Sequence, residues 1–525
     1  MTEKKSNAEP TCFLLAVISY LIIGVSVLHY YQYQINPDGI TIISVAQKYM
    51  RGDFKNAVNG CWGPLFSWLL IPFLAAKIIP LSAVKILNLL LGFFSFFAIR
   101  ALADKMELGG IEKCITYFVL VPLMLYFAYF LITQDVLFVL MLIMYFNYMF
   151  RDDYPESPLN GLLCGFFGSL AYLAKNYGFP FFLLHFFIMN ALRYLSSNSV
   201  LRKKIIKNFL SGFLIFIFIC GLWIAAISTK YGELTYSVAG KLEWMSIGPE
   251  MENRIPVLFD GLKKPPNDTA VSAWEDFADY ESRLPRWSPF SSLYNLDFFR
   301  RLVTKNIVDI SNHYHHFSVF SFSALFIYIL ICLSPPGRPY EHREIYPIVT
   351  ALIFPAGYFV CHIEARYLWP VDILILLMCG RLLTMLFAKI KFPKYAVFLI
   401  FFIVYFSFIG YPVSGLRANV NINKSAYDTA IQLKKLGVGG KIASNSMWAP
   451  SLYIAYHLGA QYYGQLSPNA SQEENIKALR DNDIDYLLDW IPDENGNPSL
   501  TIKDLKQRTQ NKEHGIDNKF YNRSK

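Results

Sequence analysis

Two aspartates stand at the borders of long apolar stretches. Asp38 lies in QINPDGI, just after the first apolar block, and Asp135 lies in LITQDVLF, between two blocks with almost no loop between them. A carboxylate fixed at the mouth of a membrane cavity can act as a general base or bind a metal ion. Each aspartate can also cap the helix that follows it, and the two roles are compatible. We predict that both are catalytic, because they form a pair of acids without a basic neighbour in sequence.

The segment HIEARYLWP offers a cation for an anionic substrate. The planar guanidinium of Arg366 can hold two phosphate oxygens at once. His362, Glu364 and Tyr367 would then line the same site. The alternative is an interfacial pair of Glu364 and Arg366, with Tyr367 and Trp369 anchoring the next helix at the membrane surface.

Two further basic groups carry weaker signals. Lys175, in AKNYGFP, can bind a phosphate or snorkel from the end of its helix, and its position favours snorkelling. The HYHH run at residues 313–316 suggests a metal site, but no acid stands at ligand spacing, which favours contact with lipid headgroups.

The elements that must position these groups are membrane helices. Of 525 residues, 54% are hydrophobic and 17% are charged, which is too apolar for a soluble fold. The apolar residues form blocks long enough to cross a bilayer, so we predict a polytopic α-helical membrane protein with about eleven transmembrane helices. The predicted spans are residues 12–30, 81–101, 114–132, 135–150, 160–175, 178–195, 208–228, 316–334, 345–363, 367–388 and 394–412.

Charge placement orients these spans. Lys and Arg fall mainly in short gaps between alternate apolar blocks, which places those gaps and the N-terminus in the cytoplasm by the positive-inside rule. The net charge of +9 is thus an orientation signal, and it does not indicate nucleic acid as a partner. Eight cysteines without a CxxC pair indicate neither a disulfide framework nor a zinc site. We predict an integral protein of the plasma (inner) membrane.

Three long segments then lie on the outer side: residues 31–80, residues 230–315 and the tail. The first contains GITIISVAQKYMRGDF, which predicts a helix in the interface plane, and then PLFSWLLIPFLAAKIIP, whose prolines predict a broken or re-entrant helix. The second is rich in tryptophan, which suits headgroups and also stacks on sugars. The tail alternates helix and strand patterns. Residues 1–412 are therefore predicted to form a transmembrane catalytic domain, and residues 413–525 an extracytoplasmic soluble α/β domain.

In order and topology, these motifs resemble the GT-C fold of polyprenyl-phosphate-sugar glycosyltransferases. This superfamily includes the protein O-mannosyltransferases and the lipid A aminoarabinose transferases. The residues that match its pattern are Asp38, Gly52, Asp53, Gly63, Pro64, Asp135, Arg366, Tyr367 and Pro370. Two departures are visible. Gly39 follows Asp38 where protein mannosyltransferases carry a second acid, and the TQD segment lacks the nearby acid of oligosaccharyltransferases, which places a bound metal in doubt.

The resemblance implies a reaction. A sugar would move, with inversion, from a polyprenyl-phosphate donor to a lipid, glycan or protein acceptor on the outer face of the membrane. Asp38 would be the base, and Arg366 and Lys175 would hold the departing phosphate. A divalent cation, Mg or Mn, held by Asp135 is a third source of positive charge.

Two other classes of protein remain open. A polymerase or ligase of lipid-linked glycans would share the outer site and the lipid donor. A flippase or transporter of lipid-linked sugars would also have many spans, but it usually shows charges at mid-membrane depth and matching halves. The sequence shows neither of these transporter features.

Overall fold

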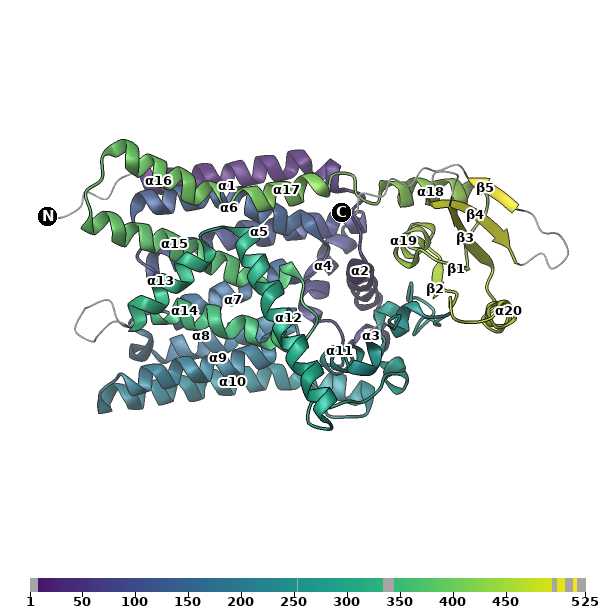
Figure 1. The fold of residues 1–525 in the computed structure, drawn as a ribbon, viewed down its shortest axis with the longest axis horizontal. Helices are drawn as coiled ribbons and strands as arrows, with labels where there is room; N and C mark the ends of the chain where they lie inside the picture. Colours follow the sequence, from purple (N-terminus) through teal and green to yellow (C-terminus); the bar gives the residue numbers. More distant parts are fainter. Residues whose placement is uncertain (1–7, 253, 334–343, 493–497, 506–512, 517–525) are drawn as a thin grey trace.

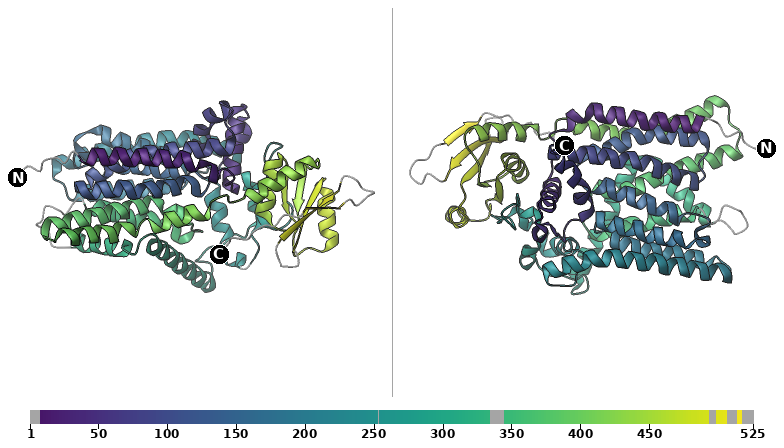
Figure 2. Two further views of the ribbon diagram at one scale, coloured as in Figure 1. Left: turned by 90° about the horizontal axis from the view of Figure 1, so that it is seen from above. Right: turned by 180° about the vertical axis from the view of Figure 1, so that it is seen from behind.

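The structure is a computed structural model that describes residues 8–252, 254–333, 344–492, 498–505 and 513–516. Long helices run side by side in a bundle, and a small sheet domain lies beyond one end of them (Figure 1). The first helix begins at the opposite end of the bundle. The two further views in Figure 2 show the same separation of bundle and sheet. The chain is therefore an integral membrane protein with a helical domain and a C-terminal α/β domain, as predicted.

The bundle consists of helices that coincide with the predicted spans. They are α1 (Ala8–Val27), α5 (Pro80–Lys105), α6 (Gly110–Phe130), α7 (Asp135–Met149), α8 (Pro158–Ala174), α9 (Gly178–Leu195), α10 (Ser199–Tyr231), α13 (Ser321–Leu333), α14 (Ile345–Ile353), α15 (Trp369–Lys389), α16 (Lys394–Phe406) and α17 (Gly410–Ala418). Within the described ranges, seven helical segments are long and apolar enough to cross a membrane, or eight if one bent pair is a single span. Helices α7, α8 and α14 are shorter, so the predicted count of about eleven is not confirmed.

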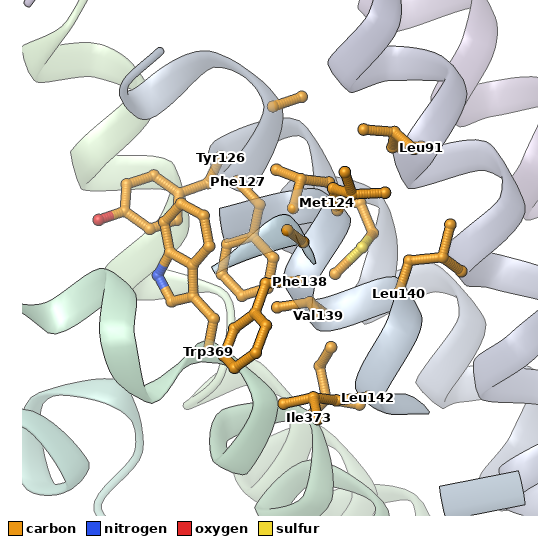
Figure 3. Packing of buried hydrophobic residues seen from close by; sticks show 14 of the residues in the cluster. Leu91, Met124, Tyr126, Phe127, Phe138, Val139, Leu140, Leu142, Trp369 and Ile373 are labelled. Atoms are coloured by element: carbon orange, nitrogen blue, oxygen red, sulfur yellow. The ribbon is translucent and has the colours of Figure 1, made fainter. Parts of the chain in front are cut away.

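Aromatic packing holds the centre of the bundle together. Trp369, at the start of α15, is fully buried and stacks on Phe127 of α6, with ring centroids 4.0 Å apart and planes 12° from parallel. Figure 3 shows these rings among the apolar side chains of α6 and α7. The alternative that Trp369 anchors the membrane surface is therefore wrong, because α15 packs inside the bundle along most of its length.

The first outer segment forms α2 (Pro37–Met50), α3 (Phe54–Ala57) and α4 (Pro64–Ala75). Thr41, Ser44 and Lys48, on the polar side of α2, are buried, and Glu275 of the second outer segment bonds Ser44 and Lys48. That α2 lies in the interface plane stays a prediction. The 12-residue α4 contains Pro72 and ends before Pro80 begins α5, which agrees with a broken helix.

The second outer segment contains α11 (Ala239–Ser246), several short 3-10 helices and α12 (Leu293–Phe317). Helix α12 meets α13 at a bend of 106°. The chain between α11 and α12 crosses over the end of the bundle that faces the sheet domain (Figure 1). It therefore lies between the two domains.

The C-terminal domain is a five-stranded sheet with three helices. Its elements are α18 (Lys424–Lys435), β1 (Lys441–Ser444), α19 (Trp448–Leu458), β2 (Gln461–Gln465), α20 (Gln472–Asp481), β3 (Tyr486–Pro492), β4 (Pro498–Asp504) and β5 (Glu513–Ile516). The strand order is β2-β1-β3-β4-β5, with β1 parallel to β2 and β3, and with β3, β4 and β5 antiparallel. The helices and strands expected between residues 424 and 490 are confirmed.

The second outer segment also extends this sheet. The backbone N–H of Tyr462, in β2, donates to the carbonyl of Val271 at 2.6 Å, and Ser272 forms an isolated parallel bridge with Tyr462. The side-chain amide of Gln461 donates to the carbonyls of Asn267 and Ala270, both at 3.2 Å. The sheet domain is thus attached to the outer segment through the edge of β2.

Candidate active site

Arg366 is the centre of a buried ionic network at the end of the bundle that faces the sheet domain. It lies in a short 3-10 helix, Ala365–Leu368, that ends where α15 begins with Pro370 in its first turn. Nη2 donates to Asp38 Oδ2 at 2.9 Å, and Nη1 donates to Asp135 Oδ2 at 3.4 Å. Nε and Nη2 also donate to the two oxygens of Glu364, at 2.9 and 2.7 Å. One guanidinium therefore joins three carboxylates.

Asp38 lies in the first turn of α2, which Asn36 precedes as the N-cap. Its second oxygen, Oδ1, accepts a hydrogen bond from Trp274 Nε1 at 3.1 Å. The alternative that Asp38 is a helix cap is therefore wrong. Gly39 explains the departure from the mannosyltransferase pattern, because a Cβ there would lie 2.5 Å from the Cβ of Ile132, in the segment that leads to Asp135.

Asp135 is the first residue of α7, and Gln134 is the N-cap. Its Oδ1 accepts from Lys175 Nζ at 2.6 Å, so its two oxygens are bonded to two different cations. Lys175 ends α8 and exposes 15% of its side chain, with Nζ 3.6 Å from the centre of the Tyr367 ring. The snorkelling prediction for Lys175 is therefore wrong.

Most of the predicted site residues thus lie in one network, which also includes the hydroxyl of Tyr367, a donor to Glu364 Oε1 at 3.0 Å. His362 is the exception. It is exposed, and its backbone N–H donates to Glu243 Oε1 at 2.9 Å. The interfacial pair of Glu364 and Arg366 exists, but Arg366 is buried and also reaches both aspartates, so it is more than a surface anchor.

The network holds three carboxylates against two cations. Burial raises the pKa of Asp38, and the charge of Glu364 adds to this, although the bond to Arg366 opposes it. Burial also disfavours the ionised form of Glu364, but the hydrogen bonds and charge of Arg366 outweigh it and lower the pKa of that group. Burial thus makes Asp38 more basic than an exposed aspartate, as suits a proton acceptor.

A divalent cation does not fit these residues as they are arranged. In the part of the chain that the structure describes, no three His, Cys, Asp or Glu side chains are grouped closely enough to hold a metal ion. Asp135, the expected ligand, has one oxygen bonded to Lys175 and the other to Arg366. A guanidinium and an ammonium lie where a metal ion would be needed.

Several functional contacts were not predicted from the sequence. Trp274 lies 236 residues from Asp38, and only its place in a tryptophan-rich outer segment hinted at a role. His313 of the HYHH run bonds both oxygens of the fully buried Asp372 at 3.0 Å, so the expected headgroup contact is wrong for this histidine. His315 and His316 are exposed.

No protein-family model matches the chain, and no curated protein matches its sequence. Among solved structures, the chain is similar to ArnT from Cupriavidus metallidurans in the apo state, with a TM-score of 0.42 and 13% identity over 91% of this chain and 93% of that one. It is also similar to ArnT from the same organism bound to undecaprenyl phosphate, with a TM-score of 0.41 and 14% identity over 88% and 87% of the two chains. This likeness concerns the overall course of the chain, and at this degree it says nothing of substrate or reaction.

Proposed function

We propose that this protein is a membrane glycosyltransferase that moves a sugar from a polyprenyl-phosphate donor to an acceptor on the outer face of the membrane. The observation that carries the proposal is the position of Arg366 between Asp38 and Asp135, at the end of the bundle where the sheet domain lies. A base and a phosphate-binding cation are the two groups that such a transfer requires. A donor with a prenyl chain could enter from the bilayer between helices.

The reaction follows from these groups. Asp38 takes the proton of an acceptor hydroxyl or amine while that group attacks the anomeric carbon of the donor sugar. The bond from that carbon to the phosphate oxygen breaks, and its electron pair leaves with the polyprenyl phosphate. A carboxylate has about four acceptor positions, so the bonds from Arg366 and Trp274 leave Asp38 able to accept a proton. Attack from the side opposite the phosphate inverts the anomeric centre.

The departing phosphate needs positive charge, and both cations of the site are engaged by carboxylates. Glu364 meets Arg366 through two parallel bonds, which is the fork geometry that a phosphate also uses. Its side chain is 34% exposed, against 10% for Asp38 and 3% for Asp135. Glu364 is therefore the carboxylate that we expect a donor phosphate to displace from Arg366.

Lys175, bonded to the other oxygen of Asp135, would help Arg366 to stabilise the departing phosphate. Its ammonium rests on the face of the Tyr367 ring and on one oxygen of Asp135, which fixes its position before substrate arrives. A cation placed in advance stabilises developing charge without the cost of reorganisation. The ion pairs with Asp135 would hold Arg366 and Lys175 close enough to reach one phosphate group.

The test is a transfer assay with purified protein in lipid nanodiscs and a polyprenyl-phosphate sugar carrying a radiolabel in the sugar. Release of polyprenyl phosphate together with label in an acceptor supports the proposal. Envelope glycans and lipid-linked sugars would be compared by mass spectrometry in cells with and without the gene, to identify the sugar and acceptor. Movement of intact donor across the membrane without cleavage would instead indicate a flippase.

A further inference from the structure

A second buried ion pair lies beside the proposed site, and the reaction makes no use of it. Lys48 of α2 donates to Glu275 Oε1 at 2.5 Å, and the two side chains are only 2% and 3% exposed. Ser44, one turn earlier on α2, donates to Glu275 Oε2 at 2.5 Å. The pair joins the first outer segment to the second across 227 residues of sequence.

Further hydrogen bonds reach Glu275 from two asparagines. Asn267 donates to Glu275 Oε1 at 3.2 Å, and Asn59 donates to the Glu275 backbone carbonyl at 2.6 Å. A buried ion pair adds little net stability, because removing two charges from water offsets their attraction, but it can fix one arrangement of segments against another. The arrangement fixed here is that of the short 3-10 helix Ala273–Glu275 on the side of α2.

The residue next to Glu275 is Trp274, the hydrogen-bond donor to Asp38. A carboxylate rotates about a broad, roughly two-fold torsion, so one hydrogen bond leaves its plane loosely defined. Arg366 bonds Oδ2 of Asp38 and Trp274 bonds Oδ1, so together they define that plane. An indole N–H only donates, so Trp274 can orient Asp38 but cannot take its proton.

The C-terminal domain supports the same tryptophan from its other side. Trp448, at the start of α19, packs against Trp274 with ring centroids 5.6 Å apart. The ring of Phe259 lies parallel to that of Trp274, with centroids 6.0 Å apart. The amide of Gln465 in β2 donates to the carbonyl of Phe259 at 2.7 Å, which joins this aromatic group to the sheet. Trp274 is therefore held by both domains.

We infer that Trp274 is a positioning residue that orients the carboxylate of Asp38 for proton transfer, and that the Lys48–Glu275 ion pair and the C-terminal domain hold Trp274 in place. The inference rests on the proposed function, in which Asp38 is the base. It adds a role for the C-terminal domain, which completes the catalytic machinery through Trp448.

The first test is Trp274→Phe, which removes the N–H donor and keeps an aromatic ring. We expect kcat to fall roughly tenfold to a hundredfold, as for a misaligned base, with KM for the donor changed less than twofold. Trp287→Phe is the matched control, because the Trp287 N–H donates to the backbone carbonyl of Trp244 and has no contact with Asp38 among the described residues. Unchanged kcat in Trp274→Phe would overturn the inference.

The second test asks whether the ion pair acts through Trp274. The double variant Lys48→Met with Glu275→Gln removes both charges together, so no unpaired charge stays buried. We expect it to lose about as much kcat as Trp274→Phe, and adding Trp274→Phe to it should lower kcat no further. If the losses instead multiply, the ion pair acts by another route and its part in the inference is wrong.

A third measurement does not depend on catalysis. It is an NMR spectrum of protein in which the nine tryptophan indoles carry 15N. The indole resonance that is missing from the spectrum of Trp274→Phe belongs to Trp274. It should shift in Asp38→Asn, because a neutral acceptor bonds the N–H more weakly than a carboxylate does. An unchanged resonance would show that Trp274 does not bond Asp38. If wild-type protein transfers no sugar, the proposed function fails, and this spectrum still decides whether Trp274 contacts Asp38.

Discussion

Arg366 Nη2 lies 2.9 Å from Asp38 Oδ2, although 328 residues separate the two in the sequence. The bond joins the first outer segment to the segment before α15. Because the same guanidinium contacts Asp135, a substitution of Arg366 changes the hydrogen bonding of both aspartates at once.

Asp38→Asn tests the base directly. The variant keeps the size of the side chain and one of the two oxygens that accept from Arg366 and Trp274. It cannot take a proton from the acceptor substrate, so turnover should fall about a hundredfold or more. The assay is transfer from a polyprenyl-phosphate sugar, with folding checked by the thermal transition. Asp53→Asn is a matched control, because Asp53 caps α3 through the N–H of Asn56 and asparagine caps as well. Near-normal transfer by Asp38→Asn would remove the base assignment.

Arg366→Lys tests the phosphate site. Lysine keeps the charge but loses the planar fork that bonds Asp38 together with Glu364, or with a phosphate that takes the place of Glu364. We expect transfer to fall at least tenfold and KM for the donor to rise. Arg381→Lys is the control, because Arg381 lies within α15 and pairs with Glu344, which precedes α14. Equal activity in Arg366→Lys would leave Arg366 with a structural role only.

Glu364→Gln should have the opposite effect on binding. Removing this negative charge frees Arg366 for a phosphate and leaves equal numbers of acidic and basic groups in the network. A gain of about 1.4 kcal/mol, or tenfold in Kd for a polyprenyl phosphate, is expected. Isothermal titration with a short-chain polyprenyl phosphate measures it. Weaker binding would mean that Glu364 positions Arg366 and is not displaced by the phosphate.

The pH dependence of transfer should reflect Asp38. Its pKa is raised by burial, and it must be ionised to act as a base, so kcat should fall on the acid side at a higher pH than for an exposed aspartate. The raised pKa also means that protonated Asp38 favours the folded state, and that this contribution is lost as the pH rises through the folded-state pKa. A plot of kcat against pH at saturating donor, from pH 4 to about 8, would show this acid limb, the fall of kcat toward low pH. A limb unchanged in Asp38→Asn would assign the titration to another group.

Topology gives a further prediction. The N-terminus should be cytoplasmic, and residues 31–80, 230–315 and the C-terminal domain should share the opposite side, because the site draws on all three. Reporter fusions after residues 8, 270 and 440 provide the measurement. A C-terminal domain on the other side of the membrane from residue 270 would contradict the packing of Trp448 on Trp274, which requires both on one side.

Four charged residues that the sequence suggested as site residues lie together in the structure. Alternating spans place the outer ends of helices on one face, and Asp38, Asp135, Lys175 and Arg366 all stand at such ends, so topology alone brings them near each other. The sequence could not show that Arg366 bridges the aspartates, because the bridge depends on the close approach of Gly39 to Ile132, in the segment before Asp135. The capping alternatives failed for a local reason, since Asn36 and Gln134 precede these helices.

Contacts made by the second outer segment were beyond sequence reasoning. Trp274 and Glu275 lie in a short 3-10 helix with no periodic pattern, and their partners on α2 are more than 200 residues away. The pairing of His313 with Asp372 was missed because the two residues lie on different helices. Strands β4 and β5 were missed as well, because the alternation in β4 is limited to Leu500 and Ile502 and β5 has only four residues.

The support that Trp448 gives to Trp274 also sets an order of assembly. A chain emerging from the ribosome has both aspartates early, receives Arg366 much later, and receives Trp448 only after the last membrane helix. At 5–20 residues per second, the roughly 80 residues between Arg366 and Trp448 take about 4–16 s to synthesise. During that interval the outer segment has no sheet edge to join. A chain that stops before the final domain would therefore carry every charged group of the site and lack the packing that supports Trp274.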